Sequence, residues 1–148
     1  MQTKQPINGI ELLKKKLGNK INNFILPPPI FTIMQCEFIS YDEIKKSLII
    51  KLPVLKKWCN VYGTMQGGMI DAAIDNAVGP LSMLLLSKPS ITRTIETKFL
   101  KAIEMKVKYI YIKTKLIEEK KRRLTFEASV EDVMGVVYAK SKLINFIL

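Results

Sequence analysis

The chain has 148 residues, of which 48% are apolar and 25% are charged. This balance predicts one soluble globular domain over residues 1–148 and excludes a disordered chain. No signal-peptide-like apolar block occurs in the first twenty residues. The longest apolar run, residues 78–86, is far shorter than the roughly 20 residues of a membrane span. Two lone cysteines, Cys36 and Cys59, show no metal or disulfide spacing, so we expect a cytoplasmic protein.

Basic residues outnumber acidic ones by 24 to 13, and the net charge is +11. Such an excess is compatible with nucleic acid, an anionic membrane surface or a phosphate-bearing ligand, but also with an ordinary solvated surface, because the lysines are spread along the whole chain. The chain contains no histidine. Ser-His-Asp and Cys-His catalytic pairs and histidine metal sites are therefore excluded, and we expect neither a metal nor a redox cofactor. Proton transfer would fall to carboxylate, lysine, tyrosine or water.

The N-terminal third predicts a helix followed by a hairpin. Residues 8–18 resemble a short helix with Asn8 as its N-cap, Glu11 completing a capping box and Gly18 at its C-terminal end. Three prolines follow and predict an extended connector that ends near residue 30. Two strand-like segments come next and predict a hairpin, residues 33–42 and 47–54.

The only long helix is predicted from Gln66 to about Ser87, with a kink or break near Gly79 because Pro80 interrupts it. Apolar residues lie on nearly every side of this segment, as in a helix buried by its surroundings. The later part of the chain is rich in β-branched and aromatic residues and predicts four strands, with turns at 118–123 and 133–137. These strands are expected at residues 91–100, 106–118, 123–132 and 136–148. One helix wrapped by a curved antiparallel sheet of five or six strands is an α+β arrangement.

Two aspartates interrupt the apolar helix. Asp71 and Asp75 are four residues apart and so share one helix face. Asp71 is expected in the first turn, where the helix dipole stabilises a carboxylate. Asp75 lies a turn further on, and burying it would demand donors, water or a ligand. Gly67 and Gly68 open the helix, where unpaired N–H groups offer a place for a polarised carbonyl oxygen.

These residues resemble the signature of the hotdog-fold acyl-CoA thioesterases, in the phenylacetyl-CoA (PaaI-like) branch of the 4-hydroxybenzoyl-CoA thioesterase superfamily. That branch usually has Asn, Gly, His-Gly-Gly and then an acidic residue nine positions after the histidine. Residues 94–102 are similar to the strand that follows the helix in the family, and the resemblance spans roughly residues 30–145. The matching positions are Asn60, Gly63, Gln66, Gly67, Gly68, Asp75 and Gly79.

The resemblance implies a role for each matching residue. Asp75 would attack the thioester or activate a water, and the Gly67 N–H would polarise the thioester carbonyl. Asn60 would place the carbonyl or the water, and Thr92 would orient the water. Gln66 stands where the family commonly has histidine; it can donate a hydrogen bond but cannot shuttle protons.

The resemblance also implies a homodimer or homotetramer in which Asp75 of one chain faces Gly67 and Asn60 of the other. Coenzyme A would enter only as part of the substrate, close to Gly68, with Arg93, Lys98 or Lys101 near its phosphates.

Two other interpretations remain open. Gln66 favours a non-catalytic hotdog dimer that binds an acyl ligand. The net charge alone favours a nucleic-acid binder, which should present aromatic and basic side chains on one exposed face. We expect neither a nucleic-acid nor a membrane partner. The acyl group is not readable from the sequence.

Overall fold

A computed structural model describes residues 7–148. Its helices and strands follow one another in an order that the sequence largely anticipates. They are α1 (Gly9–Leu17), η1 (Gly18–Asn23), α2 (Pro29–Ile33), β1 (Glu37–Asp42), β2 (Ser47–Pro53), η2 (Lys56–Trp58), α3 (Gly67–Leu86), β3 (Ser90–Phe99), η3 (Met105–Val107), β4 (Tyr109–Lys120), β5 (Arg123–Glu131) and β6 (Val137–Ile147).

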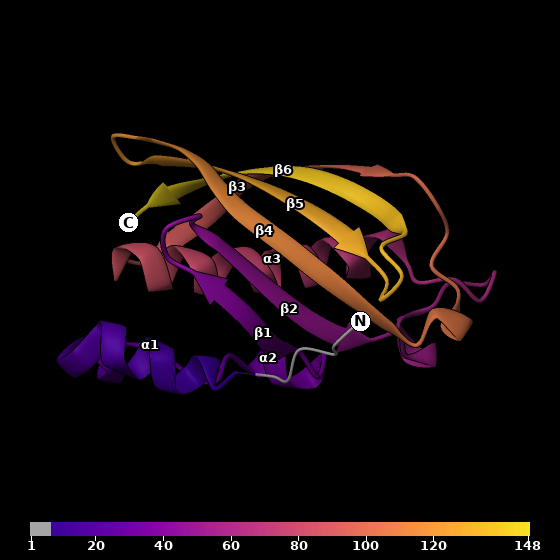
Figure 1. The fold of residues 1–148 in the computed structure, drawn as a ribbon, viewed down its shortest axis with the longest axis horizontal. Coiled ribbons are helices and arrows are strands. Elements are labelled where there is room, and N and C mark those ends of the chain that lie inside the picture. Colours follow the sequence, from indigo (N-terminus) through magenta and orange to yellow (C-terminus); the bar gives the residue numbers. More distant parts are fainter. Residues whose placement is uncertain (1–6) are drawn as a thin grey trace.

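The six strands form one antiparallel sheet in the order β1-β2-β4-β5-β6-β3. Figure 1 shows this sheet curving along α3, with α1 and α2 beside β1. The two edges differ. The chain before α1 reaches β1, where the Ile7 N–H donates to the Phe38 carbonyl at 2.8 Å. At the other edge, β3 pairs with β6 and has no second strand partner within residues 7–148.

Helix α3 is the centre of the core. Apolar residues along its length are fully enclosed, among them Ile74, Ala77 and Leu81, each 0% exposed. They meet inward-facing side chains of the sheet, such as Ile112 and Phe126. By length and apolarity, α3 is the one helix within residues 7–148 that could cross a membrane, but half of its apolar window is buried inside the domain.

Pro80 does not break α3, which runs from Gly67 to Leu86, so of the predicted kink or break near Gly79 the break does not occur. A proline inside a helix removes one backbone hydrogen bond and crowds the preceding turn. Pro80 is itself buried, and Val78 and Leu81 beside it are fully enclosed. Tertiary packing on both sides of the proline therefore holds the helix together.

The N-terminal region departs from the prediction at the prolines. Asn8 caps α1 through a 3.1 Å bond from the Glu11 N–H, as expected. The prediction of an extended connector through the prolines is only partly correct, because Pro29 is the first residue of α2. A proline at this position costs no hydrogen bond, since the N–H groups of the first helical turn have no partner within the helix. Since α2 runs to Ile33, β1 begins at Glu37 rather than at residue 33. The predicted hairpin of β1 and β2 is present.

The last two turns lie where they were predicted, with one difference. The predicted turn at 118–123 is too long: β4 continues to Lys120 and β5 starts at Arg123. Only Lys121 and Arg122 form the turn, and Lys121 adopts φ 56°. A charged segment can extend as paired strands when its backbone hydrogen bonds are satisfied and its side chains stay in solvent. The turn at Gly135, φ 84°, is confirmed.

We predict that Gly9→Ala destabilises the fold. A Cβ at position 9 would lie 2.1 Å from the ring of Phe38, which is buried and stacks on Phe31 at a centroid distance of 4.8 Å. Overpacking of this kind costs about 1–3 kcal/mol. Urea unfolding measures it. Lys15→Ala, at an exposed position of the same helix, is the control, since a surface substitution away from the core changes stability by less than about 0.5 kcal/mol. Equal unfolding midpoints for the two variants would contradict the packing argument.

We predict that Asp132 stabilises the last turn in a pH-dependent way. Partial burial acts to raise its pKa. Hydrogen bonds from the Val136 and Met134 N–H groups and the Tyr138 hydroxyl, at 2.9–3.0 Å, outweigh burial and lower that pKa. A lowered carboxyl pKa gives stability that is present above the unfolded-state value of about 4 and is lost as the pH falls through the folded-state value.

Asp132→Asn should therefore lower the melting temperature at pH 7, and the gap to wild type should close in strongly acidic buffer. Glu119→Gln, at an exposed site with no ion pair in the described chain, should leave the profile unchanged. A gap that stays constant down to pH 2 would refute the role of the charge.

Candidate functional site

The start of α3 presents two free backbone donors. Within residues 7–148, the Gly67 and Gly68 N–H groups have no acceptor, whereas the Met69 and Ile70 N–H groups bond to the Gln66 carbonyl. Gln66 is extended at ψ 138°, and its exposed side chain does not cap the helix. Free N–H groups at a helix start, at the positive end of its dipole, favour an oxygen with negative charge.

An apolar pocket adjoins these donors. The ring of Phe99, at the end of β3, covers Gly67 so closely that a Cβ there would lie 3.3 Å from it. The pocket has a volume of about 350 Å³. Besides these two residues, its lining comprises Met65, Ile70, Leu100, Lys101, Ala102 and Ile103. Sequence analysis missed Phe99 here, because its proximity to Gly67 depends on how β3 lies against α3.

Asn60 shapes the loop before the helix. Its Oδ1 accepts from the Tyr62 N–H at 3.0 Å and the Thr64 N–H at 3.3 Å, and its Nδ2 donates to the Thr64 hydroxyl at 3.1 Å. An isolated antiparallel backbone β-bridge between Cys59 and Met65 closes the same loop. The side chain is therefore largely committed to holding the turn that leads into Gln66, and one Nδ2 hydrogen remains for another acceptor.

Asp75 lies on the open face of α3. It is exposed in the single chain, so its carboxylate bears no cost of burial there. Its neighbour Asn76 is the buried polar residue instead, 3.2 Å from the Met34 sulfur. The Thr92 hydroxyl of β3 donates to Asp75 Oδ1 at 2.7 Å. The structure thus brings together the two residues that sequence analysis paired.

Asp71 has a matching partner. The Thr97 hydroxyl donates to Asp71 Oδ1 at 2.5 Å, and Thr97 also lies 2.9 Å from the Ser141 hydroxyl. The prediction that Asp71 stands in the first turn is wrong, because α3 begins at Gly67 and its first turn holds no acidic residue. A threonine on β3, rather than the helix dipole, holds this carboxylate.

An irregularity in β3 lets both threonines face the helix. Thr92 and Thr97 are five residues apart and would lie on opposite faces of a regular strand. The pairing with β6 shifts between Thr92 and Thr94, so that Arg93 is the extra residue. Beyond it, Ile95, Thr97 and Phe99 pair with Leu143, Ser141 and Ala139, which are buried on the helix side. No sequence signal marks this bulge.

The two halves of the predicted site lie far apart within one chain. Asp75 follows Gly67 by eight residues of continuous helix, which corresponds to about 12 Å along the axis. One carboxylate and one N–H group at that separation cannot both contact a single carbonyl group. In the described chain, the Gly67 donors and the Asp75–Thr92 pair are separate features on the same helix face.

The three predicted phosphate-binding residues are not clustered. Lys101 lines the pocket beside Gly67. Arg93 lies over the Phe146 ring, 5.1 Å from its centroid. Lys98 pairs with Lys140 and points to the sheet face away from α3.

Neither cysteine is an evident nucleophile. Burial raises the pKa of the Cys36 thiol to about 12, so this thiol stays protonated. The half-buried Cys59 thiol donates to the Leu55 carbonyl at 3.5 Å. In the part of the chain from residue 7 onward, no three potential metal ligands among aspartate, glutamate and cysteine come together.

No protein-family model matches this sequence, and no curated protein matches it. Solved structures do match. A phenylacetic acid degradation-related protein from Ralstonia eutropha superposes with a TM-score of 0.78 at 15% identity, over 93% of this chain and 98% of that one. The chain has the hotdog fold. Its resemblance to hotdog proteins is confirmed at the level of the fold.

Two further matches contain coenzyme A or its acetyl ester. The protein smu.793 from Streptococcus mutans, bound to acetyl CoA, is 20% identical over 75% of this chain and 86% of that one, with a TM-score of 0.68. A hypothetical thioesterase protein from Streptococcus pneumoniae with coenzyme A is 17% identical over 76% and 85%, with a TM-score of 0.70. These hotdog structures are similar to the present chain in backbone arrangement, at identities too low to transfer residue roles.

Proposed function

We propose that this chain is an acyl-CoA thioesterase of the PaaI-like branch, which hydrolyses an acyl-CoA to a free acid and coenzyme A. The observation that carries the proposal is the Asp75–Thr92 pair, a solvent-reachable carboxylate oriented by a hydroxyl at 2.7 Å. It lies on the same helix as two unpaired N–H donors at Gly67 and Gly68. Structures of the same fold that hold coenzyme A or acetyl CoA support the substrate class.

A homodimer would complete the site. Since Asp75 and Gly67 of one chain are about 12 Å apart, the carboxylate would act with the N–H group of the partner's Gly67. Two surfaces favour such a pairing. The uncovered face of α3 carries the small residues Gly68, Ala72 and Gly79 around Asp75, which permits close approach of a second helix. The unpaired edge of β3 beside it exposes Ile91 at 51% and Phe99 at 51%.

The chemistry then follows from the two groups. Asp75 takes a proton from a water that Thr92 helps to orient, and the water oxygen attacks the thioester carbonyl carbon. Alternatively the carboxylate itself attacks that carbon, and the mixed anhydride that remains on Asp75 after the thiolate leaves is hydrolysed by a water to the free acid. In either route the N–H at the start of the partner helix donates to the carbonyl oxygen as it gains negative charge. The carbon–sulfur bond breaks, and the departing thiolate of coenzyme A takes up a proton. The reaction needs water and no additional cofactor.

Gln66 supports a second candidate, a non-catalytic dimer that binds an acyl ligand. Its exposed side chain makes no hydrogen bond within residues 7–148 and cannot carry a proton. In this second candidate, coenzyme A esters would bind without turnover.

We predict that Asp75 is required for thiol release. Wild type should release thiol from at least one member of a panel of short, medium, long and aromatic acyl-CoAs. Asp75→Asn should lower kcat by about a hundredfold or more, since the amide cannot accept the proton. Asp71→Asn is the matched control, because Asp71 also accepts from a β3 threonine one turn away. If no ester releases thiol while acyl-CoAs still raise the melting temperature, the thioesterase proposal is wrong and the non-catalytic binding dimer is favoured.

We predict that the Gly67 N–H contributes to the rate. Gly67→Pro removes this donor at a helix position that tolerates proline, and the extended Gln66 suits a following proline. Gly67→Ala adds a similar contact with Phe99 but keeps the N–H. The proline variant should lose about a hundredfold in kcat and the alanine variant much less. Equal losses would assign the effect to crowding rather than to the donor.

The same variants test the shared site. When Asp75→Asn and Gly67→Pro chains are unfolded together and refolded, mixed dimers contain one intact site. Activity should return to about one quarter of wild type, as random pairing in a two-fold dimer requires. No recovery, with each variant folded and dimeric, would place both groups of the site in one chain.

A further inference from the structure

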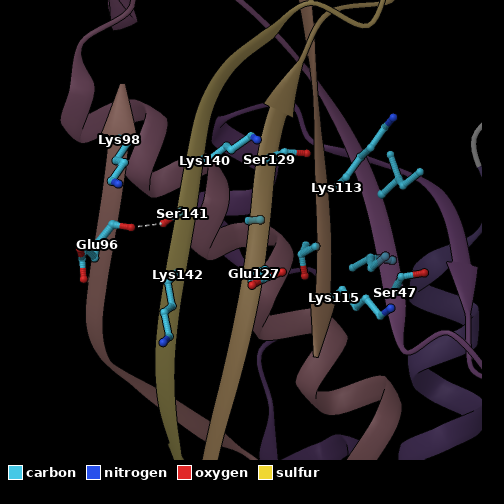
Figure 2. Close-up of a pocket in the computed structure, with 14 residues that line it drawn as sticks. Ser47, Glu96, Lys98, Lys113, Lys115, Glu127, Ser129, Lys140, Ser141 and Lys142 are labelled. Atoms are coloured by element: carbon cyan, nitrogen blue, oxygen red, sulfur yellow. Dashed lines mark hydrogen bonds between the residues drawn. The ribbon is translucent and has the colours of Figure 1, made fainter. Parts of the chain in front are cut away.

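An open groove lies on the sheet face that points away from α3. Its volume is about 750 Å³, and it crosses five strands, β2, β4, β5, β6 and β3. Figure 2 shows side chains from these strands standing in two rows across the sheet. The strand register defines the rows, because paired residues of neighbouring strands share a face.

The lower row balances its own charge. Lys115 pairs with Glu127, Glu127 with Lys142, and Lys142 with Glu96, so that positive and negative side chains alternate across four strands. None of these four residues forms an ion pair within residues 7–148, but opposite charges at directly paired positions attract one another and stabilise a sheet. The row is therefore neutral as a whole.

The upper row is different. Lys113 pairs with Ser129, Ser129 with Lys140, and Lys140 with Lys98, so this row has three lysines and no acidic residue. Glu131 neutralises Lys113 through a 2.6 Å ion pair and also accepts from the Ser129 hydroxyl at 3.3 Å. Within residues 7–148, Lys98 and Lys140 have no ion pair.

Lys98 and Lys140 are therefore two like charges at directly paired positions, an arrangement that destabilises a sheet unless an anion compensates it. In Figure 2 both side chains stand on the groove face, with Ser129 next along the row. Ammonium groups bind phosphate oxygens through short charge-assisted hydrogen bonds. Most of the residues that line the groove carry charged or hydroxyl groups, and the groove is open to solvent, so a solvated anion can reach the two ammonium groups.

We propose that the paired lysines Lys98 and Lys140 form a binding site for the phosphate groups of a small phosphorylated molecule. The site is distinct from the proposed thioester centre, because Thr97 and Phe99, on either side of Lys98, face α3 while Lys98 faces away from it. Binding here does not depend on hydrolysis, so the two proposals stand or fall separately. The bound phosphates belong either to a free nucleotide or to the nucleotide portion of coenzyme A.

The test uses calorimetry at low salt, with inorganic pyrophosphate, ADP, coenzyme A and a 20-nucleotide DNA single strand as probes. The double variant Lys98→Gln/Lys140→Gln should weaken pyrophosphate binding at least fivefold. Lys115→Gln/Lys142→Gln is the matched control, since it removes the same two charges from the lower row of the same groove, and its Kd should change less than twofold. If the Lys98→Gln/Lys140→Gln variant loses more affinity for coenzyme A than for ADP, the nucleotide portion of coenzyme A is the source, and equal losses identify a free nucleotide.

The melting temperature of the protein without ligand gives an independent test of the repulsion between the two lysines. Lys140→Gln should raise the melting temperature by relieving repulsion from Lys98, whereas Lys142→Gln should lower it by removing attraction to Glu96 and Glu127. The proposal is overturned if pyrophosphate does not bind, if both double variants lose affinity equally, or if only the DNA strand binds. It is also overturned if Lys140→Gln lowers the melting temperature as much as Lys142→Gln.

Discussion

The structure depends on the enclosure of α3 by one curved antiparallel sheet. Strands β2, β3, β4 and β5 and the N-terminal helix α1 pack against the helix, and half of its residues are buried by them. This enclosure lets the helix continue through Pro80 and keeps one narrow face open. That open face carries Asp75 and the small residues around it. The buried side of α3 therefore supplies stability, and the remaining face is free for chemistry.

Strand β3 connects the core to the site. Three of its side chains contact α3 at successive points along the helix. Thr92 donates a hydrogen bond to Asp75, Thr97 donates one to Asp71, and the Phe99 ring covers Gly67. Its outer edge has no strand partner in the described chain. A hydroxyl bonded to a carboxylate fixes the direction of the carboxylate and leaves its second oxygen free. The bulge at Arg93 is what allows one strand to orient both aspartates.

The two faces of the sheet divide the polar chemistry of the molecule. Toward α3, hydroxyl groups hold carboxylates near the open helix face. Away from α3, charges alternate in one row of the groove and remain uncompensated at Lys98 and Lys140 in the other. Much of the large net positive charge is thus ordinary surface charge. Lys98 and Lys140 differ from the other basic residues because the strand register places these two lysines directly opposite each other. Composition alone could not separate these cases.

The sequence by itself determined the element order, the one long helix, the hairpin before it and the glycine pair at its start. These features follow from local periodicity, caps and turn residues, which act over a few positions. Through the family resemblance it also suggested a role for Asp75 and a role for Thr92 at one site. Only the tertiary structure decided that α3 passes through Pro80, that Asp75 is exposed and that Asp71 bonds to Thr97. It also decided that Lys98 meets Lys140. These outcomes depend on packing, a bulge and strand register, which join residues 17 to 42 positions apart, and a local pattern does not encode such distances.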